Sequence, residues 1–206
     1  MRLTSIYQLK GRFQDLLRPL VAFFAKTGVA PNHITLAAIL LSILNGAALW
    51  AFPHHRWPWL LLPIVLFVRM ALNAMDGMLA REYQMQTKLG GVLNEVGDIV
   101  SDIFLYLPFV LVASGFAWMV VSICVLSVLS EMAGLIGVRT GVGRRYDGPM
   151  GKSDRALVFG ALGFLLGLGI RPGTWLTVVF AAVVLLILAT ILNRAAKALN
   201  GASRDA

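Results

Sequence analysis

Six long apolar segments follow one another along the chain and are separated by short breaks. They cover residues 34–52, 59–80, 91–112, 116–138, 156–170 and 175–195. Each is long enough to cross a bilayer as a helix, with tilt or flanking residues where the segment is short. The breaks contain proline and glycine, which end helices and form turns. The pattern predicts six transmembrane helices that pack as antiparallel neighbours in one bundle.

The segment before the first apolar run has a different pattern. Between residues 3 and 26, apolar side chains recur at helical spacing among basic ones. This is typical of an amphipathic helix that lies in the membrane interface. No signal-peptide pattern precedes Gly28, so we expect the segment to remain in the mature protein. The predicted fold class is an all-α integral membrane protein with six transmembrane helices plus an N-terminal amphipathic interfacial helix. Residues 1–30 form the amphipathic part, and residues 31–206 form the six-helix membrane domain.

Composition agrees with a membrane protein. Of the 206 residues, 58% are hydrophobic and only 14% are charged, which excludes a soluble enzyme, a disordered chain and a secreted disulfide scaffold. The net charge of +8 points to anionic lipid, and we expect no nucleic acid as a partner. One side of the predicted bundle holds fifteen basic residues: Arg2, Lys10, Arg12, Arg18, Lys26, Arg81, Lys88, Arg139, Arg144, Arg145, Lys152, Arg155, Arg194, Lys197 and Arg204. The other side holds Arg56 and Arg171, so both termini are predicted to be cytoplasmic.

Several charged residues fall inside the predicted spans, where facing lipid would cost several kcal/mol each. They are Arg69, Asp76, Glu95, Asp98, Asp102 and Glu131. On one helix, Arg69, Asn73, Asp76 and Ala80 share a face; on the next, Gly90, Asn94, Asp98 and Asp102 do so. We expect these two polar faces to meet near the cytoplasmic surface. They either form a functional site or hold the bundle together by interhelical hydrogen bonds.

The chemistry of these side chains favours a hard cation. Carboxylate and amide oxygens, without a thiolate or histidine cluster, select Mg²⁺, Mn²⁺ or Ca²⁺ rather than zinc or copper. A divalent ion beside a basic loop suits a diphosphate ligand, whose charge it would neutralise. We therefore predict Mg²⁺ or Mn²⁺ as the cofactor.

Two segments resemble the signature of the CDP-alcohol phosphatidyltransferase family, D-x-x-D-G-x-x-A-R followed after a spacer by G-x-x-x-D-x-x-x-D. Residues 73–81 read Asn-Ala-Met-Asp-Gly-Met-Leu-Ala-Arg, and residues 90–98 read Gly-Gly-Val-Leu-Asn-Glu-Val-Gly-Asp. Six of the eight fixed positions match: Asp76, Gly77, Ala80, Arg81, Gly90 and Asp98. Residues 28–35 and the six-helix plan are also similar to the family.

The resemblance implies a function and a location. Enzymes of this family displace CMP from a CDP-linked group with an alcohol, at a cytoplasm-facing cavity that holds divalent metal. We expect phospholipid synthesis from CDP-diacylglycerol and a small alcohol acceptor, with or without a phosphate group. We also expect a homodimer in the lipid of a bacterial inner membrane.

The resemblance also implies a role for individual residues. The metal would lie at Asp76, Asn73, Asn94 and Asp98; the CDP moiety would contact Gly77, Ala80, Arg81 and Gly90; and Asp98 would be the catalytic carboxylate that takes the proton of the acceptor hydroxyl. Asn73 and Asn94 depart from the signature, which has aspartate at both positions. An asparagine keeps an oxygen ligand but loses the charge. In the family's two-metal arrangement these positions help to hold the ions, so the double change is expected to weaken at least one metal site.

Other residues extend these expectations. Asp102, on the same face as Asn94, is better placed than Glu95 to restore the lost charge. The basic loop at residues 143–155 either attracts anionic head groups or forms a site for an acceptor phosphate, with Lys152 and Arg155 at the start of the fifth span. Arg69 either reaches the same phosphate or pairs with Glu131.

Three functions remain open at this point. The first is an active transferase. The second is a degenerate family member that binds CDP-lipid as a sensor or scaffold. The third is a small transporter with a charged midplane pathway, which does not explain the spacing of the signature. Release of CMP from CDP-diacylglycerol separates the first from the other two.

Overall fold

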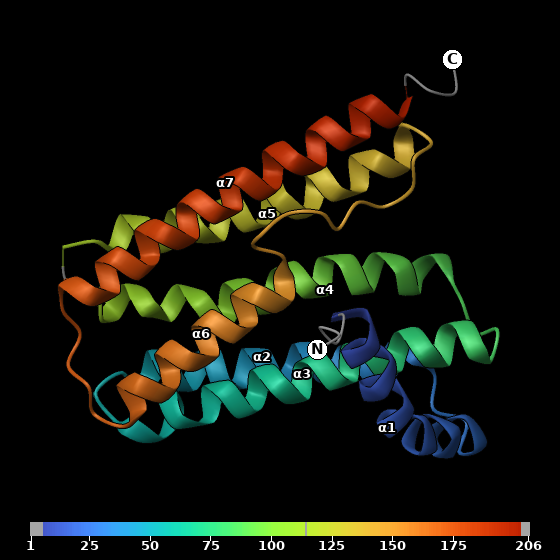
Figure 1. The fold of residues 1–206 in the computed structure, drawn as a ribbon. Coiled ribbons are helices and arrows are strands. Elements are labelled where there is room, and N and C mark those ends of the chain that lie inside the picture. Colours follow the sequence, from blue (N-terminus) through green and yellow to red (C-terminus); the bar gives the residue numbers. More distant parts are fainter. Residues whose placement is uncertain (1–5, 114, 203–206) are drawn as a thin grey trace, which may run out of the picture.

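The computed structural model describes residues 6–113 and 115–202, and these residues form seven α-helices, one 3₁₀ helix and no strand (Figure 1). The helices are α1 (Ile6–Lys26), α2 (Pro31–Ala51), α3 (Arg56–Glu82), α4 (Lys88–Tyr106), η1 (Leu107–Leu111), α5 (Ala117–Arg139), α6 (Lys152–Gly167) and α7 (Thr174–Ala202). Five of the six predicted spans therefore correspond to one helix each, the third span covers α4 and η1, and α1 corresponds to the predicted amphipathic segment. Residues 3–5 of that segment lie outside the described residues.

The six helices from α2 to α7 run back and forth between two ends of the molecule. Figure 1 shows α1, the α3–α4 connection and the end of α7 at one end, and the α2–α3, α4–α5 and α6–α7 connections at the other. Helix α5 packs on α7, α2 packs on both α3 and α4, and α6 packs on α3. Helices α4 and α6 thus lie between a layer of α5 and α7 and a layer of α2 and α3.

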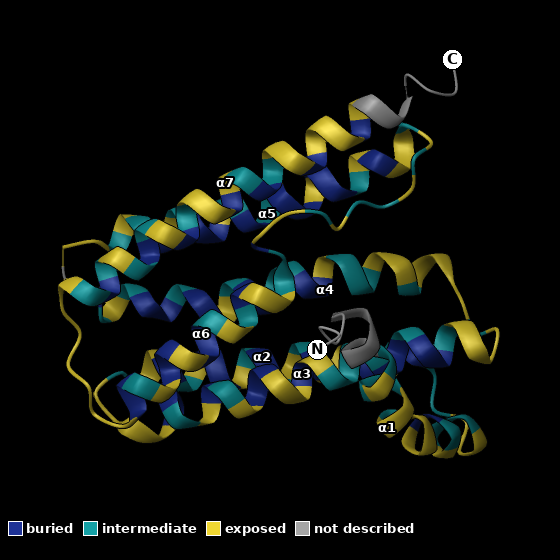
Figure 2. Ribbon diagram, in the orientation of Figure 1, coloured by how far each residue is buried: buried dark blue, intermediate teal, exposed yellow. Residues whose placement is uncertain are grey.

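Four helices, α2, α3, α5 and α7, are long and apolar enough to cross a membrane by length and composition. Helix α6 has 16 residues, and α4 contains three acidic residues. Crossing by α4 and α6 remains a prediction. Val178, Leu185 and Leu192 are exposed along one face of α7 (Figure 2), where apolar side chains suit contact with lipid.

The third predicted span ends earlier than the hydrophobic pattern indicates. Helix α4 stops at Tyr106, and the chain continues as η1. Pro108 is the second residue of η1, and proline has no backbone N–H to donate to the preceding turn. An apolar pattern does not reveal this change, because the side chains of η1 remain apolar and Phe109 is fully buried.

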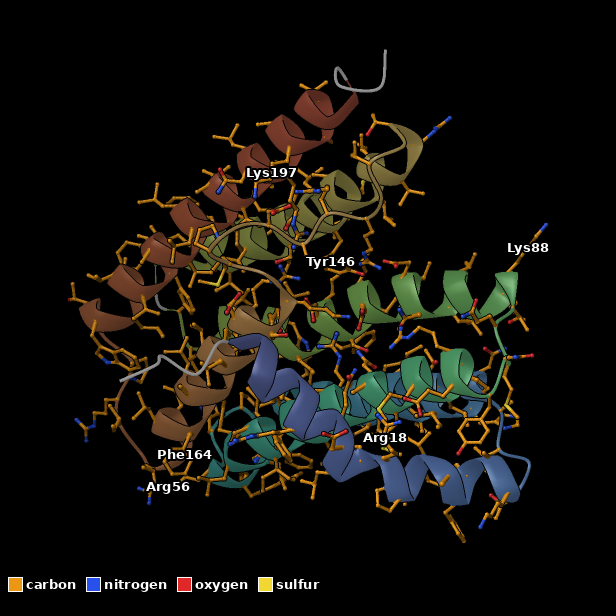
Figure 3. All side chains as sticks on the ribbon, turned by 45° about the vertical axis from the view of Figure 1, so that its right-hand side comes forward. Arg18, Arg56, Lys88, Tyr146, Phe164 and Lys197 are labelled. Carbon is orange, nitrogen blue, oxygen red and sulfur yellow. The ribbon has the colours of Figure 1, made fainter. Side chains whose placement is uncertain are left out.

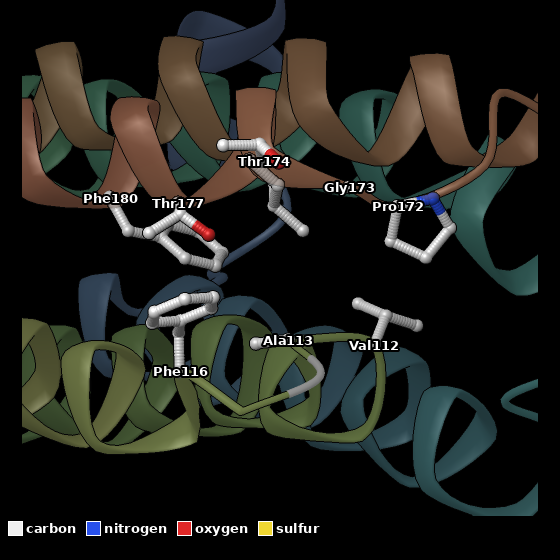
Figure 4. A pocket seen from close by; sticks show the side chains of 9 residues that line it. Val112, Ala113, Phe116, Pro172, Gly173, Thr174, Thr177 and Phe180 are labelled. Carbon is white, nitrogen blue, oxygen red and sulfur yellow. The ribbon is translucent and has the colours of Figure 1, made fainter.

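The larger of two apolar clusters lies toward the end that holds the α2–α3 and α6–α7 connections, and a smaller one joins α1, the start of α2 and the end of α3. The larger cluster is the main core. Its buried aromatic rings come from α3, α4, η1, α6 and α7. Trp59 packs edge-on against Phe109 with 4.9 Å between centroids, and Tyr106 stacks on Phe159 at 4.1 Å. A pocket of about 230 Å³ lies beside this core, between Val112 and Phe116 on one side and Pro172 to Phe180 on the other (Figure 4). It is lined by no charged side chain, so the candidate chemistry lies elsewhere.

Helices α2 and α4 approach closely at Gly46. A Cβ atom at this position would lie 2.3 Å from the backbone oxygen of Phe104, so any side chain would force the helices apart. We expect Gly46→Ala to lower the free energy of unfolding by about 1–3 kcal/mol, as overpacking does. Thermal unfolding in one detergent measures the effect.

Gly91→Ala is the matched control for this prediction. Gly91 also lies in a helix, but nothing lies within 4 Å of a Cβ atom there. Alanine at Gly91 should leave stability unchanged or raise it by up to about 1 kcal/mol. Equal melting temperatures for the Gly46→Ala variant and the unaltered protein would contradict the close packing of α2 on α4.

Candidate active site

Asp76 lies on the inner face of α3 and is 5% exposed. The hydroxyl of Thr35, on α2, donates to Asp76 Oδ2 at 2.7 Å. A Cβ atom at Gly97 of α4 would lie 3.8 Å from the methyl group of Thr35. Thr35 therefore lies between Asp76 and the segment of α4 that contains Asp98.

Three donors hold the carboxylate of Asp98, which is 7% exposed. Its Oδ1 accepts from Arg69 Nη2 at 3.1 Å and from Asn73 Nδ2 at 2.6 Å. Its Oδ2 accepts from Lys152 Nζ at 2.6 Å. The structure thus brings together four of the predicted site residues from α3, α4 and the start of α6, and both oxygens of Asp98 have partners.

One turn further along α4, Asp102 lies between two arginines. Its Oδ1 accepts from Arg69 Nη1 at 2.7 Å, and its Oδ2 accepts from Arg155 Nη2 at 3.0 Å. The alternative that Arg69 pairs with Glu131 is wrong, because its guanidinium group binds Asp98 and Asp102 instead. These two arginines balance the charge of Asp102. Asp102 therefore does not replace the negative charge that the signature loses at Asn94.

Glu131 of α5 extends the network of ion pairs. It accepts from Arg155 at 3.1 Å and from Arg144 at 3.3 Å, and Arg194 of α7 lies 3.5 Å away. Arg144 also forms an ion pair with Glu95 of α4. A chain of alternating charges therefore connects α3, α4, α5, α6 and α7 through the interior. Such pairing is what allows ionised groups to lie inside a bundle that faces lipid.

The loop between α5 and α6 is fixed to the bundle by polar contacts. Asp147 accepts from Arg145 at 2.8 Å and from Lys197 of α7 at 2.5 Å. Tyr146 and Lys197 mark this region in Figure 3. The hydrogen bond from Lys197, and then that from Arg145, lowers the pKa of Asp147 below its ordinary value. The contacts of the ionised Asp147 therefore contribute to folding stability in full above the pKa that Asp147 has in the unfolded chain. This stability is lost only as the pH falls through the lowered pKa of the folded protein, so it is present at neutral pH.

The residues predicted to contact CDP lie around the ends of α3 and α4. Arg81 is exposed in the last turn of α3, and a Cβ atom at Gly77 would lie 3.3 Å from its guanidinium nitrogens. Ala80 is partly buried beside them. A Cβ atom at Gly90 would lie only 2.7 Å from the side-chain oxygen of Asn32, at the start of α2. Both glycines thus leave room for a polar group that a larger residue would displace.

A model of the CDP-alcohol phosphatidyltransferase family matches residues 28–192. The inner membrane protein YnbA of Escherichia coli is 46% identical over 190 residues, which cover 92% of this chain and 94% of that protein. Cholinephosphotransferase 1 of Xenopus laevis is 33% identical over 85 residues, 38% of this chain and 21% of that protein. The archaetidylinositol phosphate synthase of Pyrococcus horikoshii is 27% identical over 95 residues, 46% of this chain and 48% of that protein.

The chain belongs to the CDP-alcohol phosphatidyltransferase family. The matched region begins before α2 and ends in α7, so it contains both halves of the signature and Thr35, Glu131 and Lys152. Membership supports transferase activity in general and a place in phospholipid synthesis within a membrane. The roles of individual residues and the choice of substrates are proposals that the geometry has to support.

The oxygen donor at Asp76 suits a hard divalent ion that takes its other ligands from the substrate. In the part of the chain that the structure describes, no three His, Cys, Asp or Glu side chains come together as a metal site. Asp76 supplies a hard carboxylate oxygen, and Asn73, one turn earlier on α3, carries an amide oxygen; Asn94 is partly buried on α4. Mg²⁺ is often held by one or two carboxylates together with the phosphates of the substrate. The residues therefore fit an ion that binds with a diphosphate.

Sequence reasoning missed Thr35 as part of this site, and although it named the loop at residues 143–155 as a candidate, it missed the pairing of Arg144 with Glu95 and Glu131. Thr35 belongs to the stretch at residues 28–35 that resembles the family, and its position four residues after Pro31 places it in the first turns of α2. That stretch was therefore a usable signal. Arg144 lies in a loop, and no periodicity indicates which helix a loop side chain contacts.

Proposed function

We propose that this protein transfers the phosphatidyl group of CDP-diacylglycerol to a small polar alcohol and releases CMP. The observation that carries the proposal is the position of Asp98: it lies across from Asn73 on α3, beside the segment Asp76–Arg81 that matches the family signature. The relatives named cholinephosphotransferase and archaetidylinositol phosphate synthase support transfer of this kind.

The chemistry assigns a task to each group. The acceptor oxygen bonds to the phosphorus attached to the lipid, the bond from that phosphorus to the bridging oxygen breaks, and CMP leaves with the electron pair. The proton of the acceptor hydroxyl passes to Asp98. A general base has to lie within hydrogen-bond reach of that proton. The contacts from Arg69 and Asn73 fix the carboxylate of Asp98 in one orientation for this role.

The cationic groups act on the diphosphate. Arg81 is exposed at the end of α3 and free to contact phosphate or ribose. The side chain of Lys152 is more exposed than that of Arg69, and it is flexible enough to turn toward a bound phosphate. A Mg²⁺ or Mn²⁺ ion held by Asp76 and by the amide oxygens of Asn73 and Asn94 would neutralise charge that develops on the leaving CMP.

An acceptor phosphate remains part of this proposal as one form of the substrate. Lys152 can reach it from the start of α6. Arg69 and Arg155 are 5% and 1% exposed and bind carboxylates, so they position Asp98 and Asp102 and contribute positive charge from behind the site. A phosphorylated acceptor would have to draw Lys152 away from Asp98.

The test is release of CMP by the purified protein in detergent. CDP-diacylglycerol, Mn²⁺ and a panel of alcohols, with and without phosphate groups, are mixed, and CMP is measured by chromatography. We expect release that requires both an acceptor and the divalent ion. Binding of CDP-diacylglycerol without CMP release by any acceptor would favour the second candidate, a non-catalytic lipid-binding member. The observation on its side is that asparagine replaces two signature carboxylates, at Asn73 and Asn94.

We also propose a bacterial inner membrane location, as for the relative YnbA, with the active site and both termini cytoplasmic. Figure 3 shows Arg56 at the end of the molecule opposite Lys88, and the proposed orientation places the end with Lys88 in the cytoplasm. A reporter fused to either terminus should be active only in the cytoplasm. An alkaline phosphatase fusion at the C-terminus that is active in the periplasm would overturn this orientation.

The family resemblance further supports a homodimer. Light scattering of the purified protein in detergent measures its mass directly. A mass of two chains is expected, and a mass of one chain would contradict it.

A further inference from the structure

The ion pair between Lys152 and Asp98 suggests how many metal ions this site uses. We propose that the ammonium group of Lys152 stands at Asp98 in place of a second divalent cation, so that the protein binds one divalent ion per active site, together with the diphosphate. This inference rests on the proposed function, because it concerns the same site.

The first support is the set of contacts at Asp98. Oδ1 accepts from Arg69 and Asn73, and Oδ2 accepts from Lys152, so two of the three groups that bind this carboxylate are cations of the protein. Asn73 directs its NH₂ group, not its oxygen, toward Asp98. The groups around Asp98 are therefore all donors, which suits a carboxylate whose charge is balanced by the protein itself.

The second support is the charge of the whole site. The interior network pairs the carboxylates of Glu95, Asp98, Asp102 and Glu131 with basic side chains. In the described residues, Asp76 forms no salt bridge, and its hydrogen-bond donor Thr35 is neutral. One carboxylate is thus left to attract a cation from solution, and asparagine at positions 73 and 94 removes the two charges that a second divalent ion would need.

The third support is the position of Lys152 in the fold and the anchoring of the segment that carries it. It is the first residue of α6, and the loop before it is anchored through Asp147 and through backbone contact of Arg145 with Gly134. A Cβ atom at Gly137 would lie 2.4 Å from the backbone oxygen of Gly143, so the loop packs directly on α5. The fold therefore fixes the backbone position of Lys152, from which its ammonium group reaches Asp98 Oδ2 at 2.6 Å.

The test counts ions without relying on turnover. The purified protein is dialysed against Mn²⁺ and CDP, and bound Mn²⁺ and bound CDP are both measured, with electron paramagnetic resonance of the bound Mn²⁺. We expect one Mn²⁺ per bound CDP and the spectrum of an isolated ion. Two ions in a two-metal site lie about 3.5–4 Å apart, which would give a coupled spectrum.

Two variants place Lys152 under test. The double variant Asn73→Asp/Asn94→Asp restores both signature carboxylates and keeps Lys152. The triple variant adds Lys152→Met, which also removes the ammonium group. The second Mn²⁺ should bind about tenfold or more tightly in the triple variant than in the double one. Arg139→Met, which removes an exposed cation at the end of α5, is the control and should leave the count at one.

The outcomes separate the two proposals. Two Mn²⁺ ions per CDP in the unaltered protein would overturn the inference and leave the proposed transferase standing. A second ion that binds equally well in the double and triple variants would also overturn it, since Lys152 would then occupy no cation site. Absence of CDP binding with Mn²⁺ would reject the proposed function and the inference together. If the triple variant does not fold, the count in the unaltered protein still decides.

Discussion

Asp98→Asn is expected to lower the rate of CMP release by about 10²–10⁴-fold, the range that positioned general bases contribute. An amide cannot take the proton of the acceptor hydroxyl, whereas its size matches that of the carboxylate. Steady-state kinetics with CDP-diacylglycerol and the best acceptor measure the effect. Because Asp98 is proposed to act on the acceptor, the change should appear in kcat, while the affinity for CDP stays similar.

If Asp98→Asn disturbed the fold instead of the chemistry, the melting temperature and the affinity for CDP would fall together with the rate. Asp98 binds Arg69 and Lys152, so its replacement also weakens two ion pairs. Melting temperature and CDP binding therefore have to be measured beside the rate. Asp15→Asn serves as the matched control, since it removes a carboxylate that pairs with Arg18 on α1, away from the reacting groups. An Asp98→Asn variant that folds and releases CMP at the normal rate would refute the role of Asp98.

Much of the helical fold follows from the sequence. Apolar runs bounded by proline and glycine located α2 to α7, and the mixture of basic and apolar residues located α1. The ends were less predictable. Helix α4 gives way to η1 at Leu107, and α6 begins at Lys152 rather than at residue 156, because the apolar pattern starts one turn after the first helical residue.

The site was predictable in its faces but not in its pairs. Helical spacing placed Arg69 and Asn73 on one face and Asp98 and Asp102 on another, and the structure brings these faces together. Spacing within a helix does not determine which neighbouring helix is in contact. For this reason Arg69 was open to pairing with Glu131, whereas α5 directs Glu131 toward Arg155 and the α5–α6 loop.

The same limitation applies to the loop cations. Arg144 and Lys152 belong to a sequence that is typical of a membrane-surface loop, which only indicates attraction to anionic groups. The fold directs both inward, to Glu95 and Asp98. That direction depends on the close packing of the loop on Gly134 and Gly137, which no local pattern reveals. The loop therefore contributes to the site, although its composition alone does not distinguish this role from a solvated one.

Asp76→Ala is expected to abolish Mn²⁺-dependent binding of CDP. Asp76 is the carboxylate of α3 within the signature, and the contacts of Asp98 leave it as the acidic group available to a divalent ion. Without it, only amide oxygens remain at positions 73 and 94, and neutral ligands do not balance the charge of an ion that also binds a diphosphate. Binding of radiolabelled CDP, with Mn²⁺ and with a chelator, measures the loss.

Two further variants make this result specific to the charge of Asp76. Glu82→Gln removes a carboxylate from the last turn of the same helix, where it pairs with Arg18 of α1, and should leave CDP binding intact. Thr35→Val removes the hydrogen bond to Asp76 while keeping the carboxylate, so it should weaken Mn²⁺-dependent binding by about 10–100-fold, as loss of an outer-shell partner does. If Asp76→Ala binds CDP with Mn²⁺ as tightly as the unaltered protein does, the ion lies elsewhere, and the assignment of the α3 face as the diphosphate site fails with it.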